Sequence, residues 1–406
     1  MKARKTSEPY MQHTKDFLWS FWFALPLYPY SRRQTIRTEV VKNTVWTFEQ
    51  IQGIFYVVVP IRMSVVKLDD GGLLVYAPVA PTPECIRLVN ELVAEHGDVK
   101  YIILPTISGL EHKVFVGPFA RYFRNAQVFV APKQWSFPLN LPLSWLGLPA
   151  KRTQVLPEDS SKVPFASEFD YAILGPIELG PGKFAEVAFL HKKSRTLLVT
   201  DIVVSVPAEP PAIVQLDPYP LLFHAKDKAT DVVADTYTNR CKGWQRISLF
   251  ALYFSPSVLE VPKVQDIFSN AFKASDRSKK AYFGLFPFQW RQDWQRSFAA
   301  LREDGRLFVA PVLQALILNR APQETIAWAD IVASWDFQRI VPCHFDSPIT
   351  AQPQQFRQAF SFLEKPSGIT GFATSYQLPE EDFKLLRKLD AGLQKTGIVP
   401  PAADKA

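Results

Sequence analysis

The stretch GPGKFAEVAFLHKKSRTLLVTD, residues 180–201, predicts two strands joined by a turn at Lys192-Lys193-Ser194. Both runs are rich in β-branched and aromatic residues, and the second is strongly apolar, as in a buried strand. Asp201 follows the carboxyl end of that second strand. This segment therefore predicts a hairpin that ends in a carboxylate at a sheet edge.

The chain before this hairpin predicts a β-meander followed by a β-loop-α-β unit. Asp69-Asp70-Gly71-Gly72 supplies the positive φ angles of a hairpin loop. Thr82 is a helix N-cap, Pro83 takes the first helical position, and Gly97 ends that helix. The expected strands are 54–60, 62–68, 73–79, 99–105 and 126–132, and a second helix is expected at 113–123. Two meander-plus-helix halves fit a four-layer αββα sandwich.

Four segments organise the chain. A basic, aromatic N-terminal arm covers 1–45, and the first part of the sandwich domain covers 46–206. A mostly helical insertion is expected at 207–324, with helical patches near 262–274, 289–303 and 307–319. The end of the domain, 325–406, is expected to hold a helix at 325–335, a strand at 338–344 and a helical tail.

Composition excludes several classes of protein. The 406 residues are 47% hydrophobic and 21% charged, which is ordinary for a globular protein and excludes collagen-like and disordered chains. The three Cys residues lie far apart, so neither a disulfide framework nor a CxxC zinc knuckle is possible. A reducing compartment fits best, and we expect a cytoplasmic protein. No glycine-rich phosphate loop or dinucleotide fingerprint is present.

The N-terminal arm carries most of the net charge. Residues 1–45 hold eight Lys and Arg against three Asp and Glu, which is +5 of the total of +7. Aromatic residues are interleaved with these cations, as in segments that lie in an anionic membrane interface. The uncharged run 17–31 is too short to span a bilayer and contains Pro26 and Pro29. The arm therefore either packs on the protein itself or makes peripheral contact with a thylakoid or plasma membrane. No nucleic-acid partner is expected, because no binding motif is present.

Candidate chemistry lies at the carboxyl ends of three predicted strands. Glu111-His112, Asp201 and His344 each come at or just after an apolar strand. Ligands collect at that edge of sheets flanked by helices, because the strands hold side chains there rigidly. Two His and two carboxylates would suit a Zn, Fe or Mn ion of mixed nitrogen and oxygen ligands.

The order of three segments resembles the metallo-β-lactamase superfamily. ILPTISGLEH (103–112) corresponds to the superfamily pattern T-H-x-H-x-D-H. The hairpin of 180–201 corresponds to P-G-H-T-x-G-S-V-x-F followed by T-L-L-x-x-D, and IVPCH (340–344) corresponds to P-G-H. The resemblance covers about 50–205 and 325–350 and implies the αββα sandwich. The phrases EHKVFVGPFA, APKQWSFP and SRTLLVTD are similar to a cyanobacterial and plastid family of unknown function with degenerate metal-binding motifs. This resemblance implies a fold and a map of positions, but no reaction.

Carried over residue by residue, the resemblance implies that one of two metal positions is lost. Three histidines of the first position fall on Ile107, Gly109 and Lys183, and none of these side chains supplies an imidazole. The ligands of the second position fall on Glu111, His112, Asp201 and His344. A dinuclear hydrolase of the usual kind is therefore not expected.

Two hypotheses remain for this site. In the first, the protein is a pseudoenzyme that binds a ligand or partner without chemistry, holds no metal, and pairs Lys183 with Asp201 or Glu111. In the second, one ion at Glu111, His112, Asp201 and His344 supports an atypical mononuclear hydrolase, and Lys183 replaces the charge of the lost metal as a candidate catalytic residue. Glu186 and His191 differ in strand parity, so only one of them can face the site.

Overall fold

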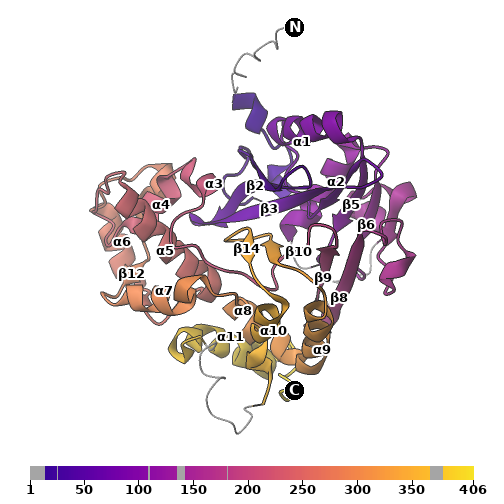
Figure 1. Ribbon diagram of the computed structural model, residues 1–406. Helices are drawn as coiled ribbons and strands as arrows, with labels where there is room; N and C mark the ends of the chain where they lie inside the picture. The colour runs from indigo at the N-terminus through magenta and orange to yellow at the C-terminus, as the bar shows by residue number, and fades with distance from the viewer. Residues whose placement is uncertain (1–13, 25, 108–109, 135–141, 181, 366–377) are drawn as a thin grey trace.

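The computed structural model describes residues 14–24, 26–107, 110–134, 142–180, 182–365 and 378–406 (Figure 1). Predictions that fall on 1–13, Gly109 or 135–141 lie outside the described residues. Two sheets occupy the middle of the molecule, with α1 and α2 on one side and α9 and α10 on the other (Figure 1).

The first sheet has seven strands in sequential order. The first four are antiparallel and the last four, from β4 onward, are parallel. The strands are β1 (Ile36–Val41), β2 (Val45–Ile54), β3 (Val57–Lys67), β4 (Leu73–Tyr76), β5 (Val99–Leu104), β6 (Gln127–Val130) and β7 (Thr153–Val155).

The strands that we predicted at 54–60 and 62–68 are wrong, because this stretch forms the single strand β3. The chain reverses earlier, at Phe55 and Tyr56, which both have positive φ. Pro60 stays inside β3 opposite Ile51, although it has no N–H to donate. Its carbonyl oxygen lies 2.8 Å from Nδ1 of His344, far along the chain.

The second sheet has five strands in the order β14-β13-β10-β9-β8. The hairpin predicted around residues 192–194 is confirmed as β9 and β10, which pair antiparallel. β10 and β13 are parallel neighbours, whereas the other pairs are antiparallel. The strands are β8 (Phe169–Glu178), β9 (Lys183–His191), β10 (Thr196–Val199), β13 (Arg339–Pro342) and β14 (Ile349–Thr350).

Three clusters of buried side chains define four layers and confirm the expected αββα sandwich. Tyr76 and Phe189 belong to a cluster between the two sheets. A second cluster packs the outer face of the first sheet against α1 (Pro83–His96) and α2 (Leu110–Tyr122). A third packs the second sheet against α9 (Pro322–Ala333) and α10 (Pro353–Gln358), where Trp328 donates to the carbonyl of Ala172. Burial on both faces explains the strongly apolar inner strands.

The segment 207–324 is mostly helical. Its elements are α3 (Ala212–Gln215), α4 (Tyr219–Ala225), α5 (Tyr237–Tyr253), β11 (Leu259–Glu260), α6 (Val264–Phe272), β12 (Gln289–Trp290), α7 (Trp294–Arg302) and α8 (Pro311–Leu316). The longest helix, α5, was not among the predicted patches. It buries residues on several sides, including Trp244, Arg246 and Leu249, so its sequence lacks a single apolar stripe.

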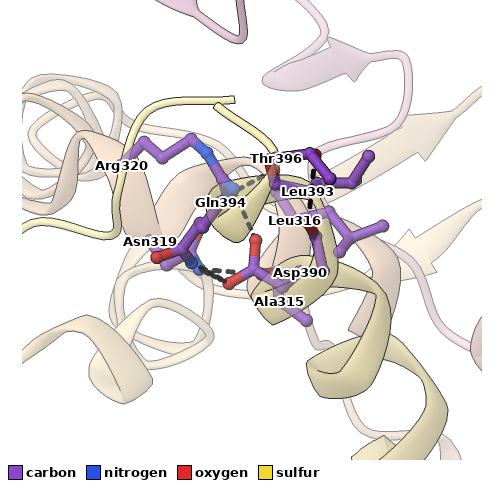
Figure 2. Close-up of polar contacts among 9 residues, drawn as sticks. Ala315, Leu316, Asn319, Arg320, Asp390, Leu393, Gln394 and Thr396 are labelled. Atoms are coloured by element: carbon purple, nitrogen blue, oxygen red, sulfur yellow. Dashed lines mark hydrogen bonds and ion pairs between the residues drawn. The ribbon is translucent and has the colours of Figure 1, made fainter. Parts of the chain in front are cut away.

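The C-terminal helix α11 (Lys384–Lys395) is attached by a buried polar group (Figure 2). Asp390 forms an ion pair with Arg320, just after α8, and accepts a hydrogen bond from Gln394 at 2.7 Å. Asn319 approaches the same carboxylate at 3.4 Å. This group joins the tail to the helical segment.

The N-terminal arm is shorter than predicted, because β1 pairs with β2 and belongs to the first sheet. The boundary at residue 45 therefore falls inside a hairpin. The charged residues Arg37 and Glu39 made the edge strand β1 hard to recognise from the sequence. The described arm packs on the protein: Trp19 is buried against Phe115, with ring centroids 5.3 Å apart, and Arg33 is fully buried. No helix in the described ranges is long and apolar enough to cross a bilayer.

Candidate metal centre

Three polar side chains from separate elements meet at one edge of the sandwich. Glu111 lies in the first turn of α2, directly after β5, and Asp201 and His344 follow β10 and β13. In this parallel pair Val199 lies opposite Pro342, so the residues two positions later leave the sheet together. The carboxyl ends of the strands therefore place the three side chains as the sequence indicates.

The three side chains form a compact set of nitrogen and oxygen donors. His344 Nε2 lies 3.0 Å from Asp201 Oδ1 and 3.5 Å from Glu111 Oε1. One donor atom from each residue lies within 4.8 Å of the other two. All three side chains are largely or partly shielded from solvent, with 12 to 25% of their surface exposed. Donors this close can contact one divalent ion together.

The orientation of His344 is fixed by a backbone carbonyl. Its Nδ1 lies 2.8 Å from the carbonyl oxygen of Pro60, which only accepts hydrogen bonds, so Nδ1 carries the hydrogen. Nε2 then faces two carboxylates and requires either a proton or a cation there. Histidines that bind metals commonly donate their second ring nitrogen in this way.

The three groups also control one another's charge. Burial lowers the pKa of His344, but hydrogen bonds to Asp201 and Glu111 outweigh burial and raise this pKa to about 10. Burial disfavours ionisation of Glu111, yet the hydrogen bond with His344 prevails and lowers the pKa of Glu111 to about 2. A metal-free cluster is therefore an imidazolium between carboxylates at neutral pH.

Glu186 holds the backbone that carries Asp201. Its fully buried carboxylate accepts the backbone N–H groups of Thr200 at 2.7 Å and Asp201 at 3.0 Å. Burial, together with the charge of Asp201, raises the pKa of Glu186 to about 7. His191 was the alternative to Glu186 for the position that faces the site, and its Nδ1 lies 2.7 Å from Ser194 Oγ instead. Glu186 is thus the residue that holds the backbone of Asp201.

His112 is fully buried next to Glu111 but lies outside the compact three-residue group. Its Nδ1 is 3.1 Å from the carbonyl oxygen of Pro78, and its Nε2 has no hydrogen-bond partner among the described residues. Burial lowers the pKa of His112, although the charge of Glu111 opposes this effect. His112 is therefore a neutral imidazole with an unpaired nitrogen.

Lys183 is not brought to this cluster. It begins β9 and forms an ion pair with Glu178 on the neighbouring strand β8, rather than with Asp201 or Glu111. Ile107, at one of the lost metal positions, is buried. We do not carry Lys183 forward as a catalytic candidate.

Arg33, one of the eight cations of the N-terminal arm, is fully buried, which its place in a basic segment did not indicate. Its guanidinium donates to the carbonyl of Ile51 at 3.0 Å and lies 5.3 Å from the ring centroid of Phe115, one helical turn after Glu111. Nε and Nη2 have no partner among the described residues. Burial lowers the pKa of Arg33 to about 10, against the opposing effect of Glu111, so Arg33 is charged at neutral pH.

Comparisons with known proteins give a family and several distant structures. A family model described as a domain of unknown function, DUF4336, matches residues 42–362. No curated protein matches the sequence. The DIM-1 metallo-β-lactamase exposed to ceftazidime has 10% identity, covers 80% of this chain and 96% of its own, and gives a TM-score of 0.37.

Two flavodiiron structures are similar at the same level. The metal-soaked Flv1 core from Synechocystis sp. has 10% identity, 92% and 72% coverage and a TM-score of 0.42. A mutant of the flavo di-iron protein from Thermotoga maritima has 8% identity, 83% and 64% coverage and a TM-score of 0.41.

Proposed function

We propose that this chain, which belongs to the DUF4336 family, binds one divalent metal ion through Glu111, Asp201 and His344. The observation that supports this proposal best is the orientation of His344. Its Nδ1–H is held by Pro60, and Nε2 faces two carboxylates at 3.0 and 3.5 Å. Imidazole with carboxylates suits Zn, Fe or Mn.

His112, which follows Glu111 in α2, is the candidate for a fourth ligand, although its ring nitrogens lie outside the compact group of Glu111, Asp201 and His344. Metal ligation requires a neutral imidazole with an available lone pair. His112 has both, because burial keeps its pKa low and its Nε2 has no partner among the described residues. An unpaired buried nitrogen is costly in a folded protein, and a bound ion would satisfy it.

Other residues of the chain hold the metal ligands in position, and among the described residues they do not form a second group of ligands. When bound, the ion supplies Lewis acidity, the chemistry expected of an atypical mononuclear hydrolase. Glu186 holds the backbone of Asp201, and Pro60 holds the ring of His344. Arg33 adds a buried positive charge near Glu111. This charge favours an anionic substrate, rather than a cationic one, beside the bound ion.

A metal-free binding protein is the second candidate function. The observation that favours it is that the cluster already compensates its own charges: the pKa of His344 is raised to about 10 and that of Glu111 is lowered to about 2. In this case the imidazolium between carboxylates is structural, and the protein binds a ligand or partner without chemistry.

Elemental analysis of untagged protein, reconstituted with Zn, Fe or Mn and freed of excess ion, separates the two functions. We expect about one equivalent of one ion in the wild type and its loss in Asp201→Asn. Glu178→Gln is the matched control, because this carboxylate lies on the exposed β8–β9 hairpin. A wild type without bound metal, or Asp201→Asn that keeps its metal while remaining folded by circular dichroism, contradicts the proposal.

A further inference from the structure

Helix α6 presents an apolar face to solvent. Val264, Phe268 and Phe272 are spaced four residues apart, so they lie on one face of the helix. Phe268 is 55% exposed and Phe272 is 76% exposed. Ala271 is the one buried residue that the helix contributes to the protein. An apolar helix face left uncovered indicates a binding surface.

Exposed positive side chains flank this face in the sequence. Residues 261–284 hold five Lys and Arg side chains against two Asp, a net charge of +3. All five cations are exposed: Lys263, Lys273, Arg277, Lys279 and Lys280. Lys280 extends over the ring of Tyr219, with its Nζ 3.9 Å from the centroid. An apolar helix face bordered by Lys and Arg is typical of helices that lie in a membrane interface.

The N-terminal arm exposes a second set of apolar side chains. Trp22, Phe23 and Tyr30 are exposed, although Trp19 and Tyr28 of the same arm are buried. Ile54, at the turn between β2 and β3, is also exposed.

Ring contacts join the arm to the segment that follows α6. Tyr30 lies 6.3 Å from Trp22 and 5.9 Å from Tyr28 between ring centroids. Tyr28 lies 5.1 Å from Tyr56, which in turn lies 5.1 Å from Tyr282. This chain of aromatic rings ends beside Phe283, which is exposed.

The β2–β3 turn and α6 are connected to the same rings. Phe55, next to Ile54, stacks on Tyr282 with ring centroids 4.1 Å apart. Gly284 lies against the last turn of α6, where an added Cβ would come 2.7 Å from the carbonyl oxygen of Ala271. The arm, the β2–β3 turn and the segment of α6 therefore meet at one group of packed rings. We call the exposed apolar side chains of these three segments the aromatic surface: Trp22, Phe23, Tyr30, Ile54, Val264, Phe268, Phe272 and Phe283.

We propose that the aromatic surface docks on the headgroup region of an anionic phospholipid bilayer. Trp, Tyr and Phe side chains partition into this region, and the cations around α6 attract its negative charge. Lys is depleted from protein–protein interfaces, which makes a protein partner a poorer match for this composition. The proposal is independent of the metal site.

Flotation with vesicles tests this proposal on the full chain. Wild-type protein is expected to float with vesicles of equal phosphatidylglycerol and phosphatidylcholine, but not with phosphatidylcholine alone. Raising NaCl from about 0.1 M to about 0.5 M should release it, because added salt screens the attraction. Wild-type protein that stays unbound on anionic vesicles overturns the proposal, as does a dimer in light scattering that Phe268→Ser disrupts.

Substitutions test whether the surface is composite. Phe268→Ser with Phe272→Ser, and separately Trp22→Ser with Phe23→Ser, are each expected to weaken vesicle binding by about tenfold or more. Ile331→Ser on α9 is the matched control, because Ile331 is 54% exposed and Figure 1 shows α9 well away from α6 and the N-terminal arm. Full binding by the α6 double variant contradicts a surface shared between the arm and the insertion.

Discussion

Replacement of Arg33 by Met tests whether its buried charge serves binding or folding. The guanidinium is fully buried, uses Nη1 to donate to Ile51, and leaves Nε and Nη2 without partners among the described residues. Met keeps an unbranched apolar side chain against Phe115 and removes the charge. We expect the variant to be slightly more stable than the wild type.

The magnitude follows from the pKa of Arg33, which burial lowers from 12.5 to about 10. Below pH 10 the group is protonated in both the folded and the unfolded chain, so the whole cost of burying its charge opposes folding. At about 1.4 kcal/mol per pH unit, this cost is about 3.5 kcal/mol. Loss of the bond from the charged guanidinium to Ile51 costs about 1.5 to 3 kcal/mol, and loss of the Phe115 contact about 0.5 to 1 kcal/mol. The net stabilisation is about 0.5 kcal/mol.

Urea denaturation at pH 7 measures this difference as a shift of the midpoint to higher urea. Arg37→Met is the control, because Arg37, four residues later on β1, is a partly exposed arginine paired with Glu91. We also expect weaker binding of inorganic phosphate to metal-loaded Arg33→Met. If Arg33→Met is instead less stable by more than about 1 kcal/mol, the guanidinium holds the arm in place and our reasoning is refuted.

Three further predictions concern stability and the support of the site. Burial lowers the pKa of His191 to about 4 and that of His224 to about 3, so the stability that depends on these two neutral imidazoles should be fully present above about pH 6.5 and be lost as pH drops below it. A melting temperature unchanged down to pH 4 would contradict buried neutral imidazoles. Trp19→Ala should cost about 3 kcal/mol in urea unfolding and make the arm susceptible to proteolysis, because Trp19 is buried against Phe115; an unchanged cleavage pattern argues against a packed arm. Glu186→Gln should weaken metal binding about tenfold or more without removing it, because one of its two backbone N–H groups loses its acceptor; unchanged affinity in a calorimetric titration would exclude this supporting role.

Local signals in the sequence were sufficient for much of the sandwich. Thr82 caps α1 by accepting the N–H of Cys85, and Gly97 ends it, as the sequence predicts. Gly71 and Gly72 adopt the positive φ angles expected of the hairpin loop. The approach of Asp201 and His344 followed from one rule, that the carboxyl ends of parallel strands share a sheet edge, whereas Glu111 comes from the other sheet.

Features that depend on tertiary packing were not predictable in the same way. Arg33 lies in a charged arm, and only its contact with Phe115 shows that the chain folds inward there. The role of Glu186 depends on the register of β9 against the end of β10, which a sequence pattern does not specify. Helix α5 buries Arg246 through its ion pair with Asp227, which removes the amphipathic period.

The most direct measurement is anomalous diffraction at the absorption edge of the ion that the reconstituted protein retains. Our account predicts a single anomalous peak in contact with His344 Nε2 and with carboxylate oxygens of Glu111 and Asp201, at about 2.0 to 2.2 Å from each. His344 Nδ1 should remain hydrogen-bonded to Pro60. A peak at other residues, or His344 Nε2 still bonded to Asp201 with no ion between them under saturating metal, would contradict the proposed site.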